Sequence, residues 1–201
     1  MKITFFFLSI VAVYACDGPV EKKQQQITSS AQYEENESDS LIISQSKQFK
    51  RLIEFLNWYK NHHEDLYMPN IVKYQEEGSS HDAYVDAEAA QELLIRYRKS
   101  GFFSDIRLEK DSLYIEEAKE AYKDKDLEVY DYFNHDRILL TQEVKGTLAA
   151  IPNTYILPSY CLLDSGQIAV SIDGFMNLQY TLIKEDGSFK ILDIENLGII
   201  K

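Results

Sequence analysis

The chain has 201 residues, of which 45% are hydrophobic and 12% aromatic, a composition typical of a globular protein with one core. Its formal net charge of −12 would repel nucleic acid and anionic lipid head groups, so we expect neither as a ligand. The sequence contains no GxSxG, HExxH, P-loop or GxGxxG motif, and we expect no cofactor.

An uncharged apolar stretch from Ile3 to Val13 follows the positive charge of Lys2. It is too short to span a bilayer as a helix but has the length of the apolar part of an export signal. Ala15 and Cys16 come next, in an order that resembles the lipobox of bacterial lipoproteins, in which the signal is cleaved before the cysteine and the cysteine is lipidated. We therefore expect a signal peptide over residues 1–15 and an exported protein, held at the membrane by lipid on Cys16 and facing the periplasm or the cell surface. An ordinary cleaved signal is the alternative.

Residues 16–44 contain few aliphatic side chains and many Gln, Ser, Glu and Asn. Such a segment cannot bury enough apolar surface to offset the conformational entropy lost on folding. We therefore expect the lipidated cysteine to begin a disordered tether that ends at residue 44, followed by a single domain over residues 45–201. Cys161 is expected to be a buried thiol, because a lipidated Cys16 leaves it no partner within the chain.

Three helices are expected in the first half of the domain. The first has one apolar stripe and a cap at Ser44 or Ser46. The second is capped by Asp86 and ends at Gly101, where a left-handed residue can terminate a helix. The third begins at Ser104 and is expected to be broken. The stripe of the first helix consists of Phe49, Leu52, Ile53, Leu56 and Tyr59.

Residues 135–144 fit either a strand or a short helix, and from Tyr155 onward the apolar period changes to two. Two Asp-Gly turns, at 173–174 and 186–187, separate apolar runs and predict hairpins. The result is an antiparallel meander of about four strands. Pro158 interrupts the first run, which places that strand at an edge or gives it a bulge.

Helices that precede strands along the chain indicate an α+β protein. We expect the N-terminal helices to pack on one face of a curved antiparallel sheet of about four strands. Both faces of this sheet are expected to contain apolar residues. These residues are Ile168, Val170 and Ile172 on one strand, and Met176, Leu178, Tyr180 and Leu182 on the next.

The C-terminal hairpin resembles the closing hairpin of the nuclear-transport-factor-2-like, cystatin-like superfamily, through Gly187, Phe189, Lys190, Ile191 and Ile194. Residues 55–62 and 135–144 are similar to an uncharacterised family of bacterial lipoproteins within that superfamily. The resemblance implies a cone-shaped fold and an envelope location. It implies no defined activity, because the superfamily includes enzymes with a carboxylate or histidine in the cone as well as binding and immunity modules.

The densest set of potential metal ligands is His62, His63 and Asp65, with Glu64 between them. Ligands of a metal site usually come from separated positions, so that their side chains converge. Adjacent residues at a helix end diverge, and the two histidines are also well placed to interact with the last carbonyl groups of the helix. The helix C-terminal role is the favoured interpretation.

His135 and Asp136 are the candidates for acid–base catalysis, since a carboxylate can orient an imidazole that titrates near neutral pH. The alternative is that this segment simply leads into the sheet.

Four aromatic residues are candidates for lining a ligand pocket on the concave side of the sheet. Large aromatic residues are more often part of the core, which is the alternative for each of them. The candidates are Trp58, Tyr160, Phe175 and Tyr180.

Three functions remain open from the sequence. The leading hypothesis is a non-enzymatic, lipid-anchored envelope protein that binds a protein or a small ligand. The second is an immunity-type protein that neutralises a secreted toxin, for which the acidic charge would suit a basic partner. The third is a small enzyme that uses acid–base residues within the cone.

Overall fold

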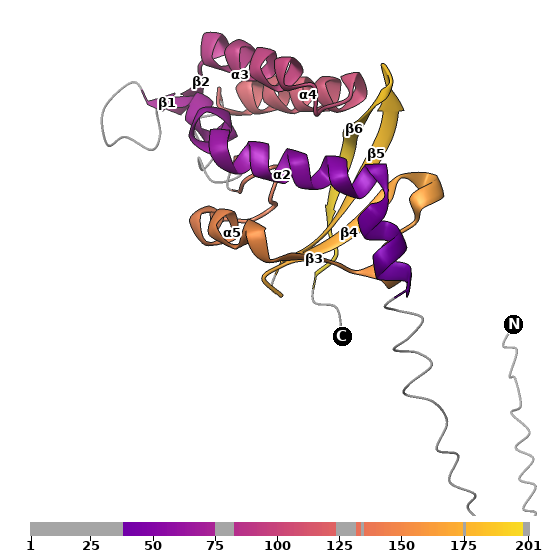
Figure 1. Ribbon diagram of the computed structural model, residues 1–201. Coiled ribbons are helices and arrows are strands. Elements are labelled where there is room, and N and C mark those ends of the chain that lie inside the picture. The colour runs from indigo at the N-terminus through magenta and orange to yellow at the C-terminus, as the bar shows by residue number, and fades with distance from the viewer. Residues whose placement is uncertain (1–37, 75–82, 124–131, 134, 175, 199–201) are drawn as a thin grey trace, which may run out of the picture.

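The computed structural model has α+β architecture, as the sequence predicted, with a four-stranded antiparallel sheet and helices packed on it (Figure 1). None of the described helices combines the length and the apolar character needed to cross a membrane. The expected signal peptide, Cys16 and most of the expected tether lie outside the described residues. The structure describes residues 38–74, 83–123, 132–133, 135–174 and 176–198.

Helix α2 (Lys47–Leu66) lies across the apolar face of the sheet (Figure 1). Ser46, one of the two predicted caps, accepts a hydrogen bond from the backbone amide of Phe49 at 3.1 Å. The buried stripe of the helix includes Phe55, which packs edge-on against Tyr180 of the sheet with a ring-centroid distance of 6.2 Å. Burial of each such large side chain contributes about 2 kcal/mol to the free energy of unfolding.

Residues 38–45 are also helical, although the sequence predicted a tether as far as residue 44. The side chain of Ile43 is 6% exposed and belongs to the main core. The short apolar run that contains Ile43 follows a long polar segment. The average composition of the whole segment is therefore polar, and composition alone did not predict this helix. The fold therefore includes residues that the sequence assigned to the tether.

Helices α3 (Ala87–Ser100) and α4 (Asp105–Ala121) pack against each other beside α2 (Figure 1). The predicted caps are confirmed: the side chains of Asp86 and Ser104 accept hydrogen bonds from first-turn amides, and Gly101 has the left-handed φ of +69°. The expected break in the third helix is wrong, because α4 is continuous over its whole range. Its apolar period is interrupted by Arg107 and Asp111, which are buried as an ion pair.

The sheet has the strand order β3-β4-β5-β6, and every neighbouring pair is antiparallel. The short strand β3 lies at one edge, as predicted from Pro158, which follows it and begins a 3₁₀ turn. The two-residue turn at 186–187 has positive φ at both positions, which is the geometry that Asp-Gly favours. The strands are β3 (Thr154–Ile156), β4 (Gln167–Ile172), β5 (Met176–Glu185) and β6 (Ser188–Asn196).

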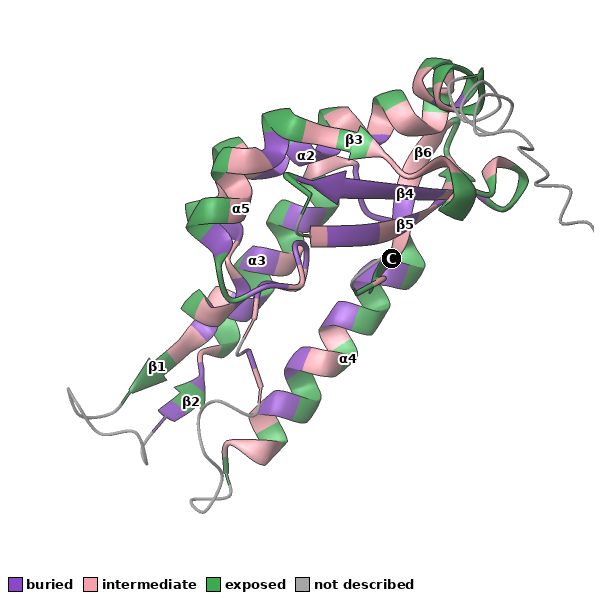
Figure 2. Ribbon diagram, turned by 90° about the horizontal axis from the view of Figure 1, so that it is seen from below, coloured by how far each residue is buried: buried purple, intermediate pink, exposed green. Residues whose placement is uncertain are grey.

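The register of the sheet corrects the expectation that both faces carry the named apolar residues. Ile168 is opposite Tyr180, and Val170 is opposite Leu178. Residues that are directly opposite each other in neighbouring strands share a face, so both sets lie on the single face that packs against the helices. The other face of β4 and β5 carries small and polar residues such as Ala169 and Gln179. Figure 2 shows that β4 is buried along almost its whole length, whereas buried and partly exposed residues alternate along β5.

Among the remaining elements, β1 (Val72–Tyr74), β2 (Ala83–Val85) and α5 (Val144–Ala150) lie beside the C-terminal end of α2 (Figure 1). Strands β1 and β2 form an antiparallel hairpin that the sequence did not predict. The short helix α5 follows the ambiguous segment 135–144, whose described residues before Val144 form turns rather than a strand. Within the described residues, these elements and the sheet are connected by the 3₁₀ helices η1 (Met68–Ile71), η3 (Ile151–Asn153), η4 (Pro158–Tyr160) and η5 (Leu163–Ser165).

We predict that Gly166→Ala destabilises the fold by about 1–3 kcal/mol. Gly166 has φ of +73°, and a Cβ atom there would lie 2.0 Å from the carbonyl oxygen of Leu182. Gly146→Ala is the matched control, because a Cβ atom in that helix has nothing within 4 Å. Urea denaturation measures both variants. Equal stability of the two variants would contradict the close approach of Gly166 to β5.

Candidate functional site

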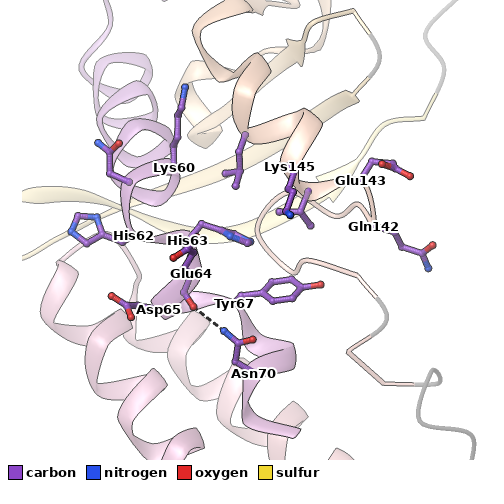
Figure 3. A pocket seen from close by; sticks show the side chains of 13 residues that line it. Lys60, His62, His63, Glu64, Asp65, Tyr67, Asn70, Gln142, Glu143 and Lys145 are labelled. Carbon is purple, nitrogen blue, oxygen red and sulfur yellow. Dashed lines mark hydrogen bonds between the residues drawn. The ribbon is translucent and has the colours of Figure 1, made fainter. Parts of the chain in front are cut away.

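A polar cleft of about 880 Å³ lies between the last turns of α2 and the first turn of α5 (Figure 3). This volume is in the range of pockets that hold small ligands. The residues that line the cleft include Lys60, His63, Glu64, Tyr67, Glu143 and Lys145.

The floor of the cleft is fixed where α2 passes into η1. Pro69 occupies the first turn of η1, and the side-chain amide of Asn70 donates a hydrogen bond to the carbonyl oxygen of Glu64 at 2.8 Å (Figure 3). That carbonyl lies in the last turn of α2, where it has no hydrogen-bond partner within the helix. Tyr67 is thereby held between the two helices, with its ring 5.0 Å from that of His63.

Behind the wall of the cleft, the carboxylate of Asp136 is 1% exposed and accepts three hydrogen bonds. One oxygen accepts from the backbone amides of Ile138 and Leu139 at 2.8 and 2.7 Å. The other accepts from the hydroxyl of Tyr59 at 2.5 Å. A buried carboxylate needs such partners to offset the loss of water, and these three connect the turn after Asp136 to α2.

His63 lies between this carboxylate and the cleft. Its Nε2 is 3.4 Å from the Tyr59-bonded oxygen of Asp136 and has no hydrogen-bond partner within the described part of the chain. The side chain is 14% exposed, and the ring of Tyr59 stands edge-on to it with a centroid distance of 5.5 Å. A protonated His63 would form an ion pair with Asp136. The arrangement places an imidazole, backed by a buried carboxylate, on the wall of a cleft.

The two tyrosines beside His63 keep their hydroxyl protons. Burial raises the pKa of Tyr59 above its ordinary value, and the negative charge of Asp136 raises it further. Burial and then the same charge raise the pKa of Tyr67. Both hydroxyl groups therefore remain protonated at neutral pH: that of Tyr59 donates to Asp136, and that of Tyr67 can donate to another group.

A second buried group of charges holds the opposite side of the same turn. The carboxylate of Asp111 in α4 accepts from Nε of Arg107 at 3.0 Å and from Nη2 of Arg137 at 3.0 Å. Arg107 also donates to the carbonyl oxygen of Arg137 at 3.3 Å. Breaking such a pair would leave an uncompensated buried charge, so these contacts fix the turn to α4.

The three metal candidates are not brought together. His62 stacks on Trp58 and its Nδ1 is 2.8 Å from the carbonyl oxygen of Trp58, whereas His63 points toward the cleft (Figure 3). Asp65 forms an ion pair with Arg96 at 3.3 Å. Among the residues that the structure describes, no group of three or more His, Cys, Asp and Glu side chains could hold a metal ion.

The two acid–base candidates have different surroundings. His135 is half-buried and is engaged with neighbouring residues. His135 directly precedes Asp136 in the sequence. The described contacts of the Asp136 carboxylate are instead with Tyr59, His63 and the backbone amides of Ile138 and Leu139. The histidine that the carboxylate faces is therefore one that the sequence offered as a metal ligand.

The aromatic pocket candidates do not gather around the cleft. Tyr180 is fully buried in the core, and its hydroxyl donates to the carbonyl oxygen of Ile138 at 3.4 Å. Trp58 is half-buried against Phe102, with a centroid distance of 5.1 Å. Tyr160 is 41% exposed in η4, and Phe175 lies outside the described residues. The apolar face of the sheet is filled by helix side chains instead of being a pocket.

The sequence did not point to Tyr67 and Lys145 as site residues. Neither residue lies in a recognisable motif. They line the same cleft because η1 and α5 pack beside the same end of α2. The expected buried state of Cys161 is only partly met: its side chain is half-buried, and its Sγ accepts from the backbone amide of Ala169 at 3.2 Å.

Taken together, the fold and the site define an α+β protein with one antiparallel sheet and a polar cleft. Comparison of the chain with models of known protein families, with curated proteins and with solved structures gives no match. The chemistry of the cleft therefore has to be argued from its own residues.

We predict that Tyr59→Phe lowers the free energy of unfolding by about 2–3 kcal/mol, because it removes a hydrogen bond to a buried charge. Tyr97→Phe is the matched control. Its hydroxyl is equally buried but donates to a neutral acceptor, the carbonyl oxygen of Leu66, at 2.9 Å, so its loss should cost about 1 kcal/mol. Urea denaturation measures the difference, and equal losses would show that Asp136 gains nothing special from Tyr59.

We also predict that the protein loses stability as the pH rises above about 10. Burial raises the pKa values of Tyr59, Tyr97 and Tyr180 in the folded state. The unfolded chain releases these protons near pH 10 while the folded chain keeps them, so the folded state binds more protons. The free energy of unfolding should fall by about 1.4 kcal/mol per pH unit for each tyrosine.

Denaturation at several pH values between about 9 and about 11 measures this slope. Tyr97→Phe should reduce the slope by the contribution of one proton. An unchanged slope in that variant would mean that Tyr97 ionises equally well in the folded protein.

Proposed function

We propose that this protein is a non-enzymatic binding module, anchored to the cell envelope by lipid on Cys16, that holds a small ligand in the cleft between α2 and α5. The order of Ala15 and Cys16 after an apolar stretch supports the anchor. The resemblance of the C-terminal hairpin to cystatin-like proteins is part of the same proposal, and the α+β architecture is compatible with it.

The observation that carries the binding function is the composition of the cleft wall. Side chains from α2, the residue before η1 and α5 present hydrogen-bonding groups to one space of about 880 Å³. The ammonium groups of Lys60 and Lys145 have no ion-pair partner within the described part of the chain. Uncompensated polar groups around a concavity are typical of a ligand site.

A second candidate function, a small acid–base enzyme, is favoured by the contact between His63 and Asp136. A carboxylate that orients an imidazole at a cleft wall is an arrangement that can transfer protons. If this function is correct, a ligand captured by the protein should be converted, and His63→Gln should abolish conversion even when the ligand is supplied at saturating concentration. Capture of an unchanged ligand would leave only the binding function.

The binding function is tested by capture of small molecules from an extract of the native envelope. We predict that the full chain in detergent retains a small molecule, identified by mass spectrometry, and that Leu148→Trp prevents this because the larger side chain fills the cleft. Leu113→Trp is the matched control, since Leu113 is 59% exposed on α4 and outside the cleft. Retention by both variants, or by neither, would contradict the cleft as the binding site.

The anchor is tested separately with the same full chain. Mass spectrometry of its N-terminus should find lipid on Cys16, and Cys16→Ser should move the protein out of the membrane fraction. A Cys16→Ser protein that stays in the membrane fraction would overturn the anchor and leave the binding function standing.

A further inference from the structure

We propose that the cleft recognises an anionic oxygen group of its ligand, a carboxylate or a phosphate, through Lys145, Tyr67 and His63. This inference rests on the proposed binding function and adds the chemical class of the ligand. Figure 3 shows the three side chains pointing into the same part of the cleft, from α5, from the residue between α2 and η1, and from the last turns of α2.

Each of the three groups can donate a hydrogen bond, and none has a side-chain partner within the described residues other than the 3.4 Å contact of His63 with Asp136. The ammonium group of Lys145 is a permanent donor at neutral pH. The hydroxyl of Tyr67 remains protonated because burial and the charge of Asp136 raise its pKa. Lys145 and Tyr67 present two donors to one space with no acceptor among the described residues, and a doubly protonated His63 would add its Nδ1–H as a third. Such a set matches the lone pairs of a carboxylate or phosphate.

His63 connects this space to the buried charge behind it. Its Nε2 faces Asp136, which leaves Nδ1 for a group in the cleft. An anion at Nδ1 and the Asp136 carboxylate at Nε2 would each accept a hydrogen bond from a doubly protonated ring. The ligand would therefore complete an arrangement in which His63 is paired on both sides.

The carboxylates around the cleft do not form a cation site. Asp65 is neutralised by Arg96. The side chain of Glu143 points away from the space between His63 and Lys145 (Figure 3). Among the described residues, no three acidic or histidine side chains converge as metal ligands would. Asp65 and Glu143 are thus directed elsewhere, and Glu64 is the carboxylate that remains beside the converging donors (Figure 3). The donors outnumber the carboxylates there, so this part of the cleft favours a negative group.

The acidic balance of the whole chain makes this local arrangement necessary. With a formal net charge of −12, the surface would repel an anion on average. An anionic ligand can bind only where cations are concentrated, and the attraction should weaken as salt screens it. Glu64 and Glu143 line the cleft without an ion-pair partner among the described residues, and they should further select a ligand with one small anionic group over a polyanion.

The inference is tested by NMR titration of the full chain in detergent micelles, with acetate and inorganic phosphate as separate probes and tetramethylammonium as the cationic probe. We expect one of the anions to shift amide signals at the end of α2 and the start of α5 in a saturable way. Lys145→Gln and Tyr67→Phe should each weaken that binding about tenfold. Lys99→Gln is the matched control, because it makes the same charge change on the exposed last turn of α3.

The two anions distinguish the source of the group: tighter binding of acetate indicates a carboxylate ligand, and tighter binding of phosphate a phosphorylated one. Shifts in the cleft with tetramethylammonium alone, no shifts there with either anion, or an equal effect of Lys145→Gln and Lys99→Gln would overturn the inference. The proposed function fails by a different result, namely capture of a ligand from the extract that Leu148→Trp does not prevent.

Discussion

The fold depends on the buried carboxylate of Asp136 and the turn that it organises. This turn lies between α2, α4 and β5, and each of them supplies a polar group to it: Tyr59 bonds the carboxylate, Arg107 bonds a backbone carbonyl, and Tyr180 bonds the next carbonyl. Backbone groups outside regular structure must find partners when they are buried. Here the partners come from three elements, α2, α4 and β5. The turn can therefore form only when these elements have packed together.

The cleft is a consequence of that turn. Because Asp136 is anchored to α2 and Arg137 to Asp111 of α4, the chain leaves the turn in a fixed direction and begins α5 beside the end of α2. The space between these two helix ends is the cleft. The backbone around the cleft is therefore held by buried contacts, whereas a ligand would still have to order exposed side chains such as Lys145.

Much of the fold could be predicted from the sequence because its signals are local. The caps at Ser46 and Asp86 and the terminator Gly101 are each recognised within one helical turn. Pro158 limits the strand before it to an edge or a bulged position, and the structure has it at the edge. The site could not be predicted in the same way. Tyr59 and Asp136 are 77 positions apart, and no pattern in either segment indicates the other, so the sequence paired Asp136 with its neighbour along the chain.

The buried charges explain why the helical periodicity was misleading in α4, and they also explain where the site lies. Polar residues inside a helix lower its apolar signal, and Arg107 and Asp111 did so in α4, although they are paired in the interior. Paired charges of this kind contribute more to the choice of one arrangement than to stability. Asp111 has two guanidinium partners, whereas Asp136 has only hydrogen-bond donors and the imidazole of His63 within the described residues. Asp136 is thus the less compensated of these two buried carboxylates, and it is the one that lies behind the wall of the cleft.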